Sequence, residues 1–536
     1  RATLNELQNY IDFRAEHGRY SGVTAIYQQD SLVFSAVSGM ANRSWQMENT
    51  PDSRFDLASV TKMFTATATG ILLERAELAL DENFMHYWPD FPLPEANTVT
   101  IRLLLSHTSG LSDMFFEKAY LHFDRSRLRK LSDYDRFYQQ LKLGDVPQGR
   151  IAYSNTNFLI LGRIIEKVTG TDYYTFVQEE IFSPLRMESS CFYVKDEIVP
   201  HRAEGYFRDA QASAVFGVPI DGTLRSNRAI RAIKGMPAGG AYSTAADMHR
   251  FIRGLRSGSL LSAPTLAQMT TEVQGGYGLG FQTYRQQEIQ VWGHSGGFYG
   301  VSTMVFYLPE KQLTFISLTN QDFAAQPVMD RFLNLLAGQP TYEPISLSAD
   351  ALKKYEGHFE VVSGEMQGQQ LSIQAMEDHL LFDNALQFYP IGNHRFVDID
   401  NDGFVMTFSF SEAGELLGFD RGDNRMFQQE ARKIDASQVS QLQPQAIPEE
   451  ILREYAVKFQ FTEEGMMPGH QPEFTVEDGA LLVDNMMRFL PYERDKFFQA
   501  DDTRMRLHFF RNEEGEIDQI QVLRGKEVVG ALLPKE

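Results

Sequence analysis

The last third of this chain repeats itself, and this repeat limits how the whole chain can fold. Beyond a stretch containing Pro and Gly at residues 338–344, similar segments recur at a spacing of about one hundred residues. The matching pairs are residues 352–359 with 452–459, 380–384 with 481–485, 387–390 with 488–491, and 395–396 with 496–497. We therefore predict two copies of one domain, at residues 345–440 and 448–536.

Both copies carry the sequence pattern of short strands. Segments of alternating hydrophobicity, such as residues 404–410 and 505–510, are separated by turns rich in Gly, Asp and Asn. Strands of this length and spacing predict an antiparallel barrel of about eight strands in each copy. We expect two lipocalin-like β-barrels.

Residues 1–340 carry a different pattern, which predicts a separate domain of helices around a sheet. Helices are expected at residues 3–17, 157–168 and 328–337, the second of them closed by Gly170 as a C-terminal signal, and residues 92–262 read as mainly helical. Strands are expected at residues 22–27, 32–37, 289–292, 302–307 and 313–318. The pattern indicates a sheet flanked by helices, with a helical subdomain.

Three short motifs in this first domain indicate a serine acyl-transfer enzyme. They are Ser59-Val-Thr-Lys62, Tyr153-Ser-Asn155 and His294-Ser-Gly296, the last within residues 293–297. An alcohol is a poor nucleophile at neutral pH, so such a site needs a base and donors for the developing oxyanion. On a helix, a spacing of three places the Lys62 side chain within reach of Ser59. A buried helix would desolvate Lys62 and lower its pKa, and Tyr153 is the natural second member of the proton-transfer pair.

With their flanks, these motifs resemble the penicillin-recognising serine hydrolases of peptidase family S12. This superfamily contains class C β-lactamases, D,D-carboxypeptidases, D-aminopeptidases and related esterases. The supporting flanks lie at residues 55–62, 103–111, 237–247 and 277–281. The resemblance implies an α/β, β-lactamase-like catalytic domain that forms an acyl-enzyme.

The resemblance also implies a role for each motif residue. The nucleophile would be Ser59, and the proton-transfer pair would be Lys62 and Tyr153. Substrate-binding positions would be Asn155, His294, Ser295 and Gly296, with Asn155 and His294 also part of the catalytic set. The oxyanion hole would be formed by the backbone N–H groups of Ser59 and Gly297.

His294 occupies a place often held by lysine in this family, which affects the expected substrate. A histidine of ordinary pKa is mostly neutral at pH 7, whereas lysine can grip a terminal carboxylate. Substrates that depend on a carboxylate are therefore less favoured. A second histidine, His107, lies in a polar turn and is expected to fix that loop by hydrogen bonds. The Gly239-Gly240 pair is expected to permit a tight turn near the pocket.

The sequence thus predicts a serine hydrolase acting on peptide or amide bonds of small peptides, either D-aminopeptidase-like or D,D-peptidase-like. A carboxylesterase, a weak β-lactamase of the same family, and a slowly deacylating β-lactam sensor are the alternatives. The two barrels are similar to the added domains of the D-aminopeptidase branch, and they could shape access to the site or stabilise or oligomerise the enzyme. Glu463 and Glu464 are candidates to hold a substrate ammonium group, with a solvated turn as the alternative.

Composition limits the partners of the chain. A net charge of −21 and a pI near 5.1 argue against nucleic acid, and no apolar run approaches the length of a membrane span. Cys191 is the only cysteine, which excludes an intrachain disulfide and a cysteine-based zinc site, and we predict a small buried side chain there. No cofactor and no metal are predicted, the partner is a small peptide or acyl substrate, and a homo-oligomer is left open. Because the chain begins at Arg1, we expect a processed N-terminus and a periplasmic or secreted protein, with the cytoplasm as the alternative.

Overall fold

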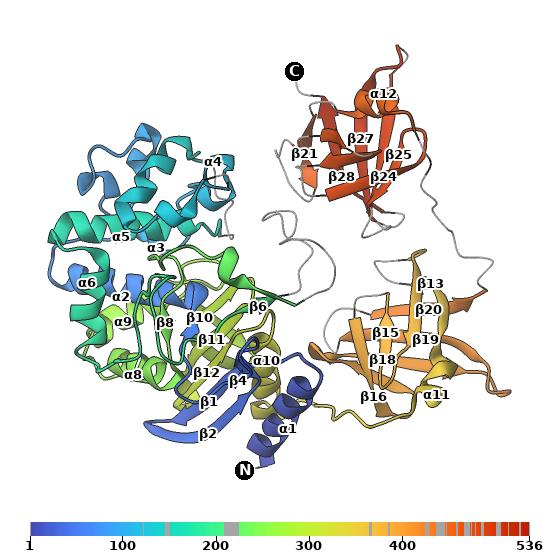
Figure 1. The fold of residues 1–536 in the computed structure, drawn as a ribbon, viewed down its shortest axis with the longest axis horizontal. Coiled ribbons are helices and arrows are strands. Elements are labelled where there is room, and N and C mark those ends of the chain that lie inside the picture. The colour runs from blue at the N-terminus through green and yellow to red at the C-terminus, as the bar shows by residue number, and fades with distance from the viewer. Residues whose placement is uncertain are drawn as a thin grey trace. The chain divides into compact units, whose positions relative to one another are not determined.

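The chain folds into two compact units (Figure 1). The computed structural model describes residues 2–534 apart from 122, 145–150, 208–223, 364–366, 384–385, 424–427, 436–444, 446, 457–458, 466–471, 473, 478, 484–486, 500–504, 513 and 525–526. The first unit contains the described residues up to Gln339, and the second contains those from Pro340 onward.

A six-stranded antiparallel sheet forms the centre of the first unit, in the order β2-β1-β12-β11-β10-β9. Its strands are β1 (Gly22–Gln28), β2 (Ser31–Ser38), β9 (Gln282–Gln286), β10 (Ile289–Phe298), β11 (Val301–Leu308) and β12 (Leu313–Thr319). Successive residues of a strand point to opposite faces, and each face is covered by its own core. Phe306 and Phe315 belong to the core under α1 (Ala2–Glu16) and α10 (Ala325–Leu336), whereas Val305 and Ile316 belong to the larger core on the other face.

The larger core lies among helices that surround one buried helix, α2 (Lys62–Glu74). Every residue of α2 from Lys62 to Leu72 is buried. Helices α5 (Asn155–Thr169) and α6 (Tyr173–Val177) pack against it, and the same unit contains α3 (Ile101–Leu105), α4 (Lys118–Leu121), α8 (Ala245–Arg256) and α9 (Ala263–Thr270). The expected C-terminal signal at Gly170 is present, since this glycine ends α5 with a φ of 70°.

Short antiparallel strand pairs lie outside the central sheet. They are β3 (Met40–Asn42) with β4 (Met47–Glu48), β5 (Phe55–Asp56) with β8 (Tyr242–Ser243), and β6 (Tyr206–Phe207) with β7 (Arg225–Ser226). The pairing of β5 with β8 joins the chain just before Ser59 to a segment almost two hundred residues later. Ser59 itself lies in a 3-10 turn, η1 (Ala58–Thr61), and α2 begins only at Lys62.

The second unit contains both predicted β domains, which confirms this part of the fold class. The first copy is a closed antiparallel barrel of β13 (Gly357–Ser363), β14 (Gln370–Ala375), β15 (Leu380–Phe382), β16 (Leu386–Gly392), β17 (Arg395–Asp398), β18 (Asn401–Phe410), β19 (Leu416–Asp423) and β20 (Gln428–Ile434). A short helix, α11 (Ala349–Leu352), precedes it.

The second copy repeats this order after its own short helix, α12 (Glu449–Leu452). It is an eight-stranded antiparallel sheet of β21 (Phe459–Gly465), β22 (Phe474–Glu477), β23 (Ala480–Val483), β24 (Met487–Glu493), β25 (Lys496–Gln499), β26 (Met505–Arg511), β27 (Ile517–Arg524) and β28 (Glu527–Pro534). Where the structure describes this copy, β21 and β22 form the two ends of the sheet and do not pair. The predicted domain limits at residues 345–440 and 448–536 stay predictions.

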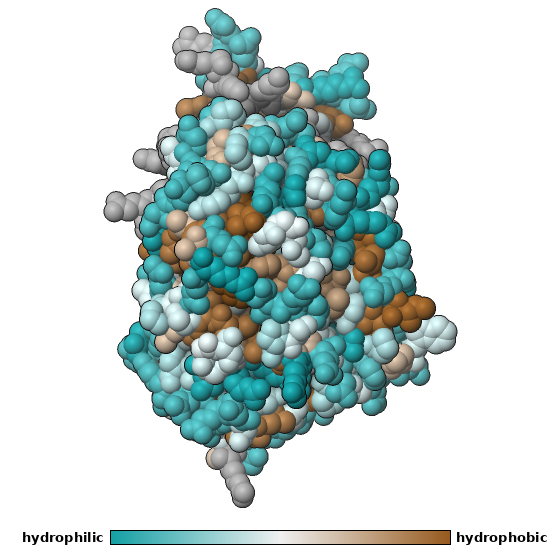
Figure 2. All heavy atoms as spheres, turned by 90° about the vertical axis from the view of Figure 1, so that its left-hand side faces the viewer, coloured by the Kyte–Doolittle hydropathy of each residue, from teal (hydrophilic) through white to brown (hydrophobic). Residues whose placement is uncertain are grey.

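The face shown in Figure 2 is largely hydrophilic, with hydrophobic side chains in several separate groups. Across the described ranges, no helix combines the length and apolar character needed to cross a membrane. Cys191 is only partly buried, which differs from the expected buried side chain because it lies at an isolated β-bridge with Tyr242 rather than inside a core.

Candidate active site

Lys62 is fully buried and makes three polar contacts around its amine. The Nζ atom lies 3.0 Å from Ser59 Oγ, 2.8 Å from Asn155 Oδ1 and 2.7 Å from the carbonyl oxygen of Ala238. Burial lowers the pKa of Lys62 to about 7, against a smaller opposing effect of Asp113. A neutral amine has two hydrogens and one lone pair, and two of its three neighbours can only accept hydrogens. With both hydrogens donated to Asn155 and Ala238, the lone pair is left for the Ser59 hydroxyl.

Tyr153 lies in the segment just before α5, next to Ser59. Its phenol is hydrogen-bonded to the Ser59 side chain, and its ring centre lies 4.9 Å from Lys62 Nζ. Desolvation of the phenol raises the pKa of Tyr153 above its ordinary value, the hydrogen bond with Ser59 opposes this rise, and Asp113 adds to it. The phenol therefore carries its proton at neutral pH, whereas Lys62 is close to half deprotonated.

Asn155 links Lys62 to a carboxylate that sequence reasoning missed, Asp113. The Asn155 side chain donates from Nδ2 to Asp113 Oδ2 at 2.7 Å, and its backbone N–H donates to the same oxygen at 2.9 Å. These bonds orient the amide so that Oδ1 faces Lys62. The only local signal for Asp113 was a capping position before the short 3-10 helix η4 (Met114–Phe116), where its other oxygen accepts the Phe115 N–H.

His294 lies on strand β10 and is buried, with 1% of its surface exposed. Its Nδ1 lies 2.5 Å from the Ser295 carbonyl oxygen, and its Nε2 lies 2.8 Å from the Tyr277 hydroxyl. Because a carbonyl can only accept, we assign the proton to Nδ1, and Nε2 then accepts from Tyr277. Burial, followed by the proximity of Lys62, lowers the pKa of His294 to about 3. The ring is uncharged at neutral pH. From the sequence, Tyr277 was recognised only as part of the flanking segment 277–281, and its contact with His294 was not predicted.

The Gly296-Gly297 segment of β10 lies directly against the turn that carries Ser59. A Cβ atom on Gly296 would lie 2.3 Å from the Leu57 carbonyl oxygen and 3.1 Å from the Ser59 nitrogen, so only glycine permits this approach. Gly297 is exposed, and a Cβ there would meet nothing within 4 Å. The backbone next to Ser59 therefore has an open side at Gly297. The oxyanion hole formed by the N–H groups of Ser59 and Gly297 stays a prediction.

His107 makes the hydrogen bonds expected of it and also contacts a site residue. Its Nδ1 accepts the Ser154 N–H at 3.2 Å, and its carbonyl oxygen accepts the Ala152 N–H at 2.9 Å. The ring packs against the Tyr153 ring, with centres 4.1 Å apart. Burial holds the pKa of His107 well below its usual range. This turn therefore fixes the segment that carries Tyr153.

The structure thus brings the residues of all three motifs together, from segments far apart in the chain. Hydrogen bonds link Ser59, Lys62, Tyr153 and Asn155. His294 lies close enough to Lys62 for the charge of the lysine to lower the pKa of the histidine. Their catalytic and binding roles stay predictions. Of the acidic pair Glu463 and Glu464, the structure describes the backbone in β21, and their side chains lie outside its description.

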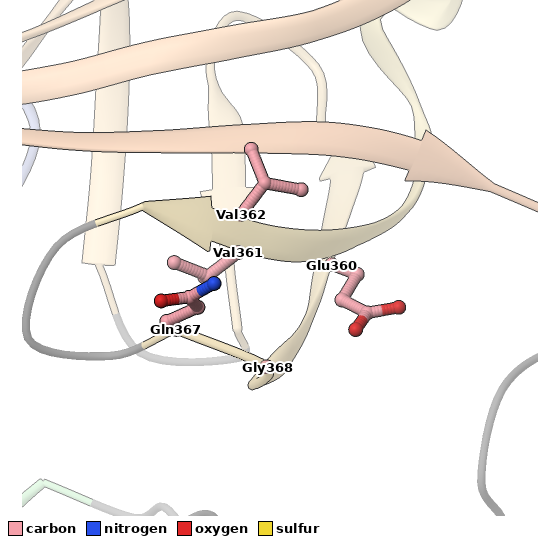
Figure 3. A pocket seen from close by; sticks show the side chains of 5 residues that line it. All are labelled: Glu360, Val361, Val362, Gln367 and Gly368. Atoms are coloured by element: carbon pink, nitrogen blue, oxygen red, sulfur yellow. The ribbon is translucent and has the colours of Figure 1, made fainter.

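Two cavities lie apart from this site. The larger, of about 390 Å³, belongs to the first barrel and is lined by Glu360, Val361, Val362, Gln367 and Gly368 (Figure 3). The smaller, of about 300 Å³, lies in the first unit and includes Arg228, Arg231 and Tyr242 in its wall. Within the described part of the chain, no three His, Cys, Asp or Glu side chains are grouped so as to hold a metal ion.

Comparison with known proteins identifies the family of the first unit. The β-lactamase family model matches residues 7–339. The chain belongs to the β-lactamase family. Penicillin-binding protein 4* of Bacillus subtilis is 27% identical over 364 residues, which cover 65% of this chain and 79% of that protein. The D-aminopeptidase of Brucella anthropi is 24% identical, and the match covers 65% of each chain.

Solved structures of similar proteins agree with this family. The D-amino acid amidase from Ochrobactrum anthropi SV3 superposes with a TM-score of 0.54 at 25% identity, covering 63% of this chain and 99% of that one. The octameric penicillin-binding protein homologue from Pyrococcus abyssi superposes with a TM-score of 0.57 at 22% identity, covering 80% and 99%. At that identity the second match shows the fold alone. Together the relatives support a serine hydrolase of this family.

Proposed function

We propose that this protein hydrolyses peptide or amide bonds of small peptides through an acyl-enzyme on Ser59, in the manner of a D-aminopeptidase. The single observation that carries the proposal is the environment of the Lys62 amine. Two acceptors take its hydrogens, and burial lowers its pKa to about 7, so a large fraction of Lys62 is neutral at pH 7 and its lone pair is available to the Ser59 hydroxyl at 3.0 Å. This is what activation of a serine nucleophile requires.

The order of proton transfers follows from the two opposite pKa shifts. Lys62, with a lowered pKa, takes the Ser59 proton as Oγ attacks the substrate carbonyl, and the N–H groups of Ser59 and Gly297 hold the oxyanion. Tyr153, with a raised pKa, gives its proton to the leaving amine as the C–N bond breaks. The proton on Lys62 then replaces the one lost by Tyr153. In deacylation a water takes the place of the amine and the same pair works in reverse.

The uncharged state of His294 favours a D-aminopeptidase over a D,D-peptidase. Both ring nitrogens are already hydrogen-bonded and the ring is buried, so this position offers no cation to a substrate carboxylate. Similarity to the D-aminopeptidase and the D-amino acid amidase supports the same choice. An uncharged side chain at position 294 is also compatible with uncharged ester substrates, which makes a carboxylesterase the second candidate. Homo-oligomer formation is a further part of the proposal, supported by the octameric state of the Pyrococcus abyssi homologue.

The first test is steady-state hydrolysis of D- and L-alanine p-nitroanilide beside p-nitrophenyl acetate, with wild type and Ser59→Ala. We expect turnover of the D-anilide that disappears in Ser59→Ala. Turnover of the acetate alone would move the assignment to an esterase. One stoichiometric burst without further release would indicate a slowly deacylating sensor, and activity that survives Ser59→Ala would refute the proposed nucleophile.

A further inference from the structure

The residue before the nucleophile has a backbone conformation that alanine rarely adopts. Ala58 has a φ of 43°, in the left-handed region, although it is not a glycine. An L-residue is strained there by contact between its Cβ and the backbone, so the surrounding structure must hold it in place. Ala58 also shares a peptide plane with the Ser59 N–H, and its dihedral angles set the direction in which that N–H points.

One buried ion pair holds this residue. Asp56 accepts the Ala58 N–H at 2.8 Å through Oδ1, and its Oδ2 lies 2.9 Å from the Arg231 guanidinium. Arg231 donates further to the Tyr242 hydroxyl. The pairing of β5 with β8 places Asp56 opposite Tyr242, so both partners of Arg231 belong to one strand pair. Few exposed atoms remain, with 8% of Asp56 and 15% of the Arg231 side chain accessible.

Glycines close the two sides of the same turn and leave it little room to relax. A Cβ on Gly239 would lie 3.3 Å from the Ala58 carbonyl oxygen, and Gly296 lies against Leu57 on the other side. The turn is thus enclosed by close backbone contacts, while Ala58, its residue in the left-handed conformation, is held by the Asp56 carboxylate. A hydrogen bond to a charged acceptor is stronger than one to a neutral acceptor, so Asp56 is well suited to keep Ala58 in its strained conformation.

We propose that Asp56 and Arg231 are positioning residues that hold the Ala58–Ser59 peptide so that the Ser59 N–H points into the oxyanion hole. Neither side chain touches the substrate. The inference rests on the proposed function, because it assigns Ser59 as nucleophile and its N–H as an oxyanion donor. It predicts that loss of the pair weakens stabilisation of the transition state and leaves binding of the ground state nearly intact.

The smaller cavity makes this inference testable by chemical rescue. Arg231 and Tyr242 line the cavity of about 300 Å³, so truncating Arg231 leaves space that opens into an existing hollow. In Arg231→Ala we expect kcat for p-nitrophenyl acetate to fall about a hundredfold, as for loss of an oxyanion donor, with KM changed by less than about twofold. Guanidinium chloride well below denaturing concentration should restore part of kcat, while equal concentrations of potassium chloride or urea should not.

Arg228→Ala is the matched control. Arg228 lines the same cavity, is exposed, and lies outside the machinery described above. Its truncation should leave kcat unchanged and show no response to guanidinium. Equal losses in the two variants, or rescue of both, would overturn the inference by showing a general effect of the cavity.

A second variant covers the case in which Arg231→Ala fails to fold. Asp56→Asn keeps the shape of the side chain and an oxygen for the Ala58 N–H, but it removes the charge that binds Arg231. We expect a fall in kcat with KM nearly constant and an unchanged circular dichroism spectrum. A folded Asp56→Asn or Arg231→Ala with wild-type kcat would overturn the inference even if turnover still depends on Ser59. Loss of that dependence would instead overturn the proposed function.

Discussion

The centre of the first unit and the interior of the first barrel differ in the groups that they bury. Around Ser59 basic side chains are buried beside an apolar core, with Lys62 and His107 fully buried and His294 almost so. Inside the barrel the core is apolar and rich in aromatic rings, among them Phe359, Phe396, Phe408 and Phe419, which pack mostly edge to face. The first region buries basic groups at its reactive centre, whereas the second buries mainly apolar surface.

This difference separates what sustains the fold from what performs the chemistry. Burial of aromatic surface stabilises the barrel, because each ring removes a large apolar area from water. Burial of basic groups opposes folding, because each must lose its proton or remain charged out of water. The catalytic centre therefore gains its reactive lysine at a cost in stability, and substitutions in the two regions should affect activity and stability in opposite proportions.

The largest expected effect is on activity, from Lys62→Met. Methionine has a similar length and cannot accept a proton, so kcat/KM should fall about a thousandfold, equivalent to about 4 kcal/mol. The free energy of unfolding of the first unit should change by no more than about 2 kcal/mol, since removal of a buried basic group offsets the loss of bonds to Asn155 and Ala238. Ester hydrolysis and urea unfolding at pH 7 measure the two quantities. If the free energy of unfolding fell by more than the free-energy equivalent of the loss in kcat/KM, the proposed difference between the two regions would be wrong.

The reverse pattern is expected for Phe408→Ala in the barrel. Truncating a buried phenylalanine leaves a cavity and should lower the free energy of unfolding of the barrel by about 3–4 kcal/mol. The three tryptophans, Trp45, Trp88 and Trp292, all lie in the first unit, so their fluorescence reports its unfolding alone, while circular dichroism also detects the barrels. We expect the substitution to shift part of the circular dichroism transition and to leave the fluorescence transition and Ser59-dependent turnover in place. A fluorescence shift of the same size would show that the two units unfold together.

The sequence predicted the elements whose pattern is local. The alternation and turns of the two repeats were sufficient to predict the barrels, and Gly170 correctly marked the end of α5. Strand β10 was predicted to end at Trp292 but continues to Phe298, because the glycines at positions 293, 296 and 297 are usually signals for a turn. Here they are required in a strand, since Gly296 lies against the Ser59 turn.

The parts of the site that the sequence did not predict depend on contacts across the fold. Asp113 reads as a helix cap, and nothing local indicates that Asn155 lies against it. Asp56 and Arg231 are likewise far apart in the chain and meet only because β5 pairs with β8. The sequence predicted a mostly neutral His294 from the ordinary pKa of histidine, but it did not predict the further fall in pKa, which is caused by burial and by Lys62.

A smaller effect, on the pH dependence of stability, tests the buried lysine directly. The folded-state pKa of Lys62 is about 7, below the value of about 10.4 of an unfolded chain, so between these values the unfolded state binds more protons. The stability of the first unit should therefore rise with pH above 7, by at most about 1.4 kcal/mol per pH unit from this group. Fluorescence-detected urea unfolding at pH 7 and pH 8 should show this rise in wild type, and Lys62→Met should lack it. Equal slopes in the two proteins would mean that Lys62 stays charged in the folded state.

The smallest effect concerns a polar contact that the two barrel copies make differently. In the first copy the Tyr355 hydroxyl is hydrogen-bonded to His394 Nδ1 at 2.8 Å, and the centre of the His394 ring lies 4.7 Å from that of Phe410. In the second copy the Tyr455 hydroxyl donates to Asp495 Oδ1 at 3.0 Å, and the same carboxylate forms an ion pair with Arg511 at 2.9 Å. The repeat aligns His394 with Asp495 and Phe410 with Arg511, so the aromatic and ionic pairs are alternatives at one place. His394→Asp alone should destabilise the first barrel, because its carboxylate would face Phe410. Adding Phe410→Arg should recover about 1 kcal/mol in a double-mutant cycle followed by circular dichroism. Such recovery would show that polar contacts of the barrel can be exchanged as pairs. Lys62 differs, because no exchange of a residue pair would restore its role in the catalytic centre. Strictly additive losses would show that each copy depends on its own surroundings.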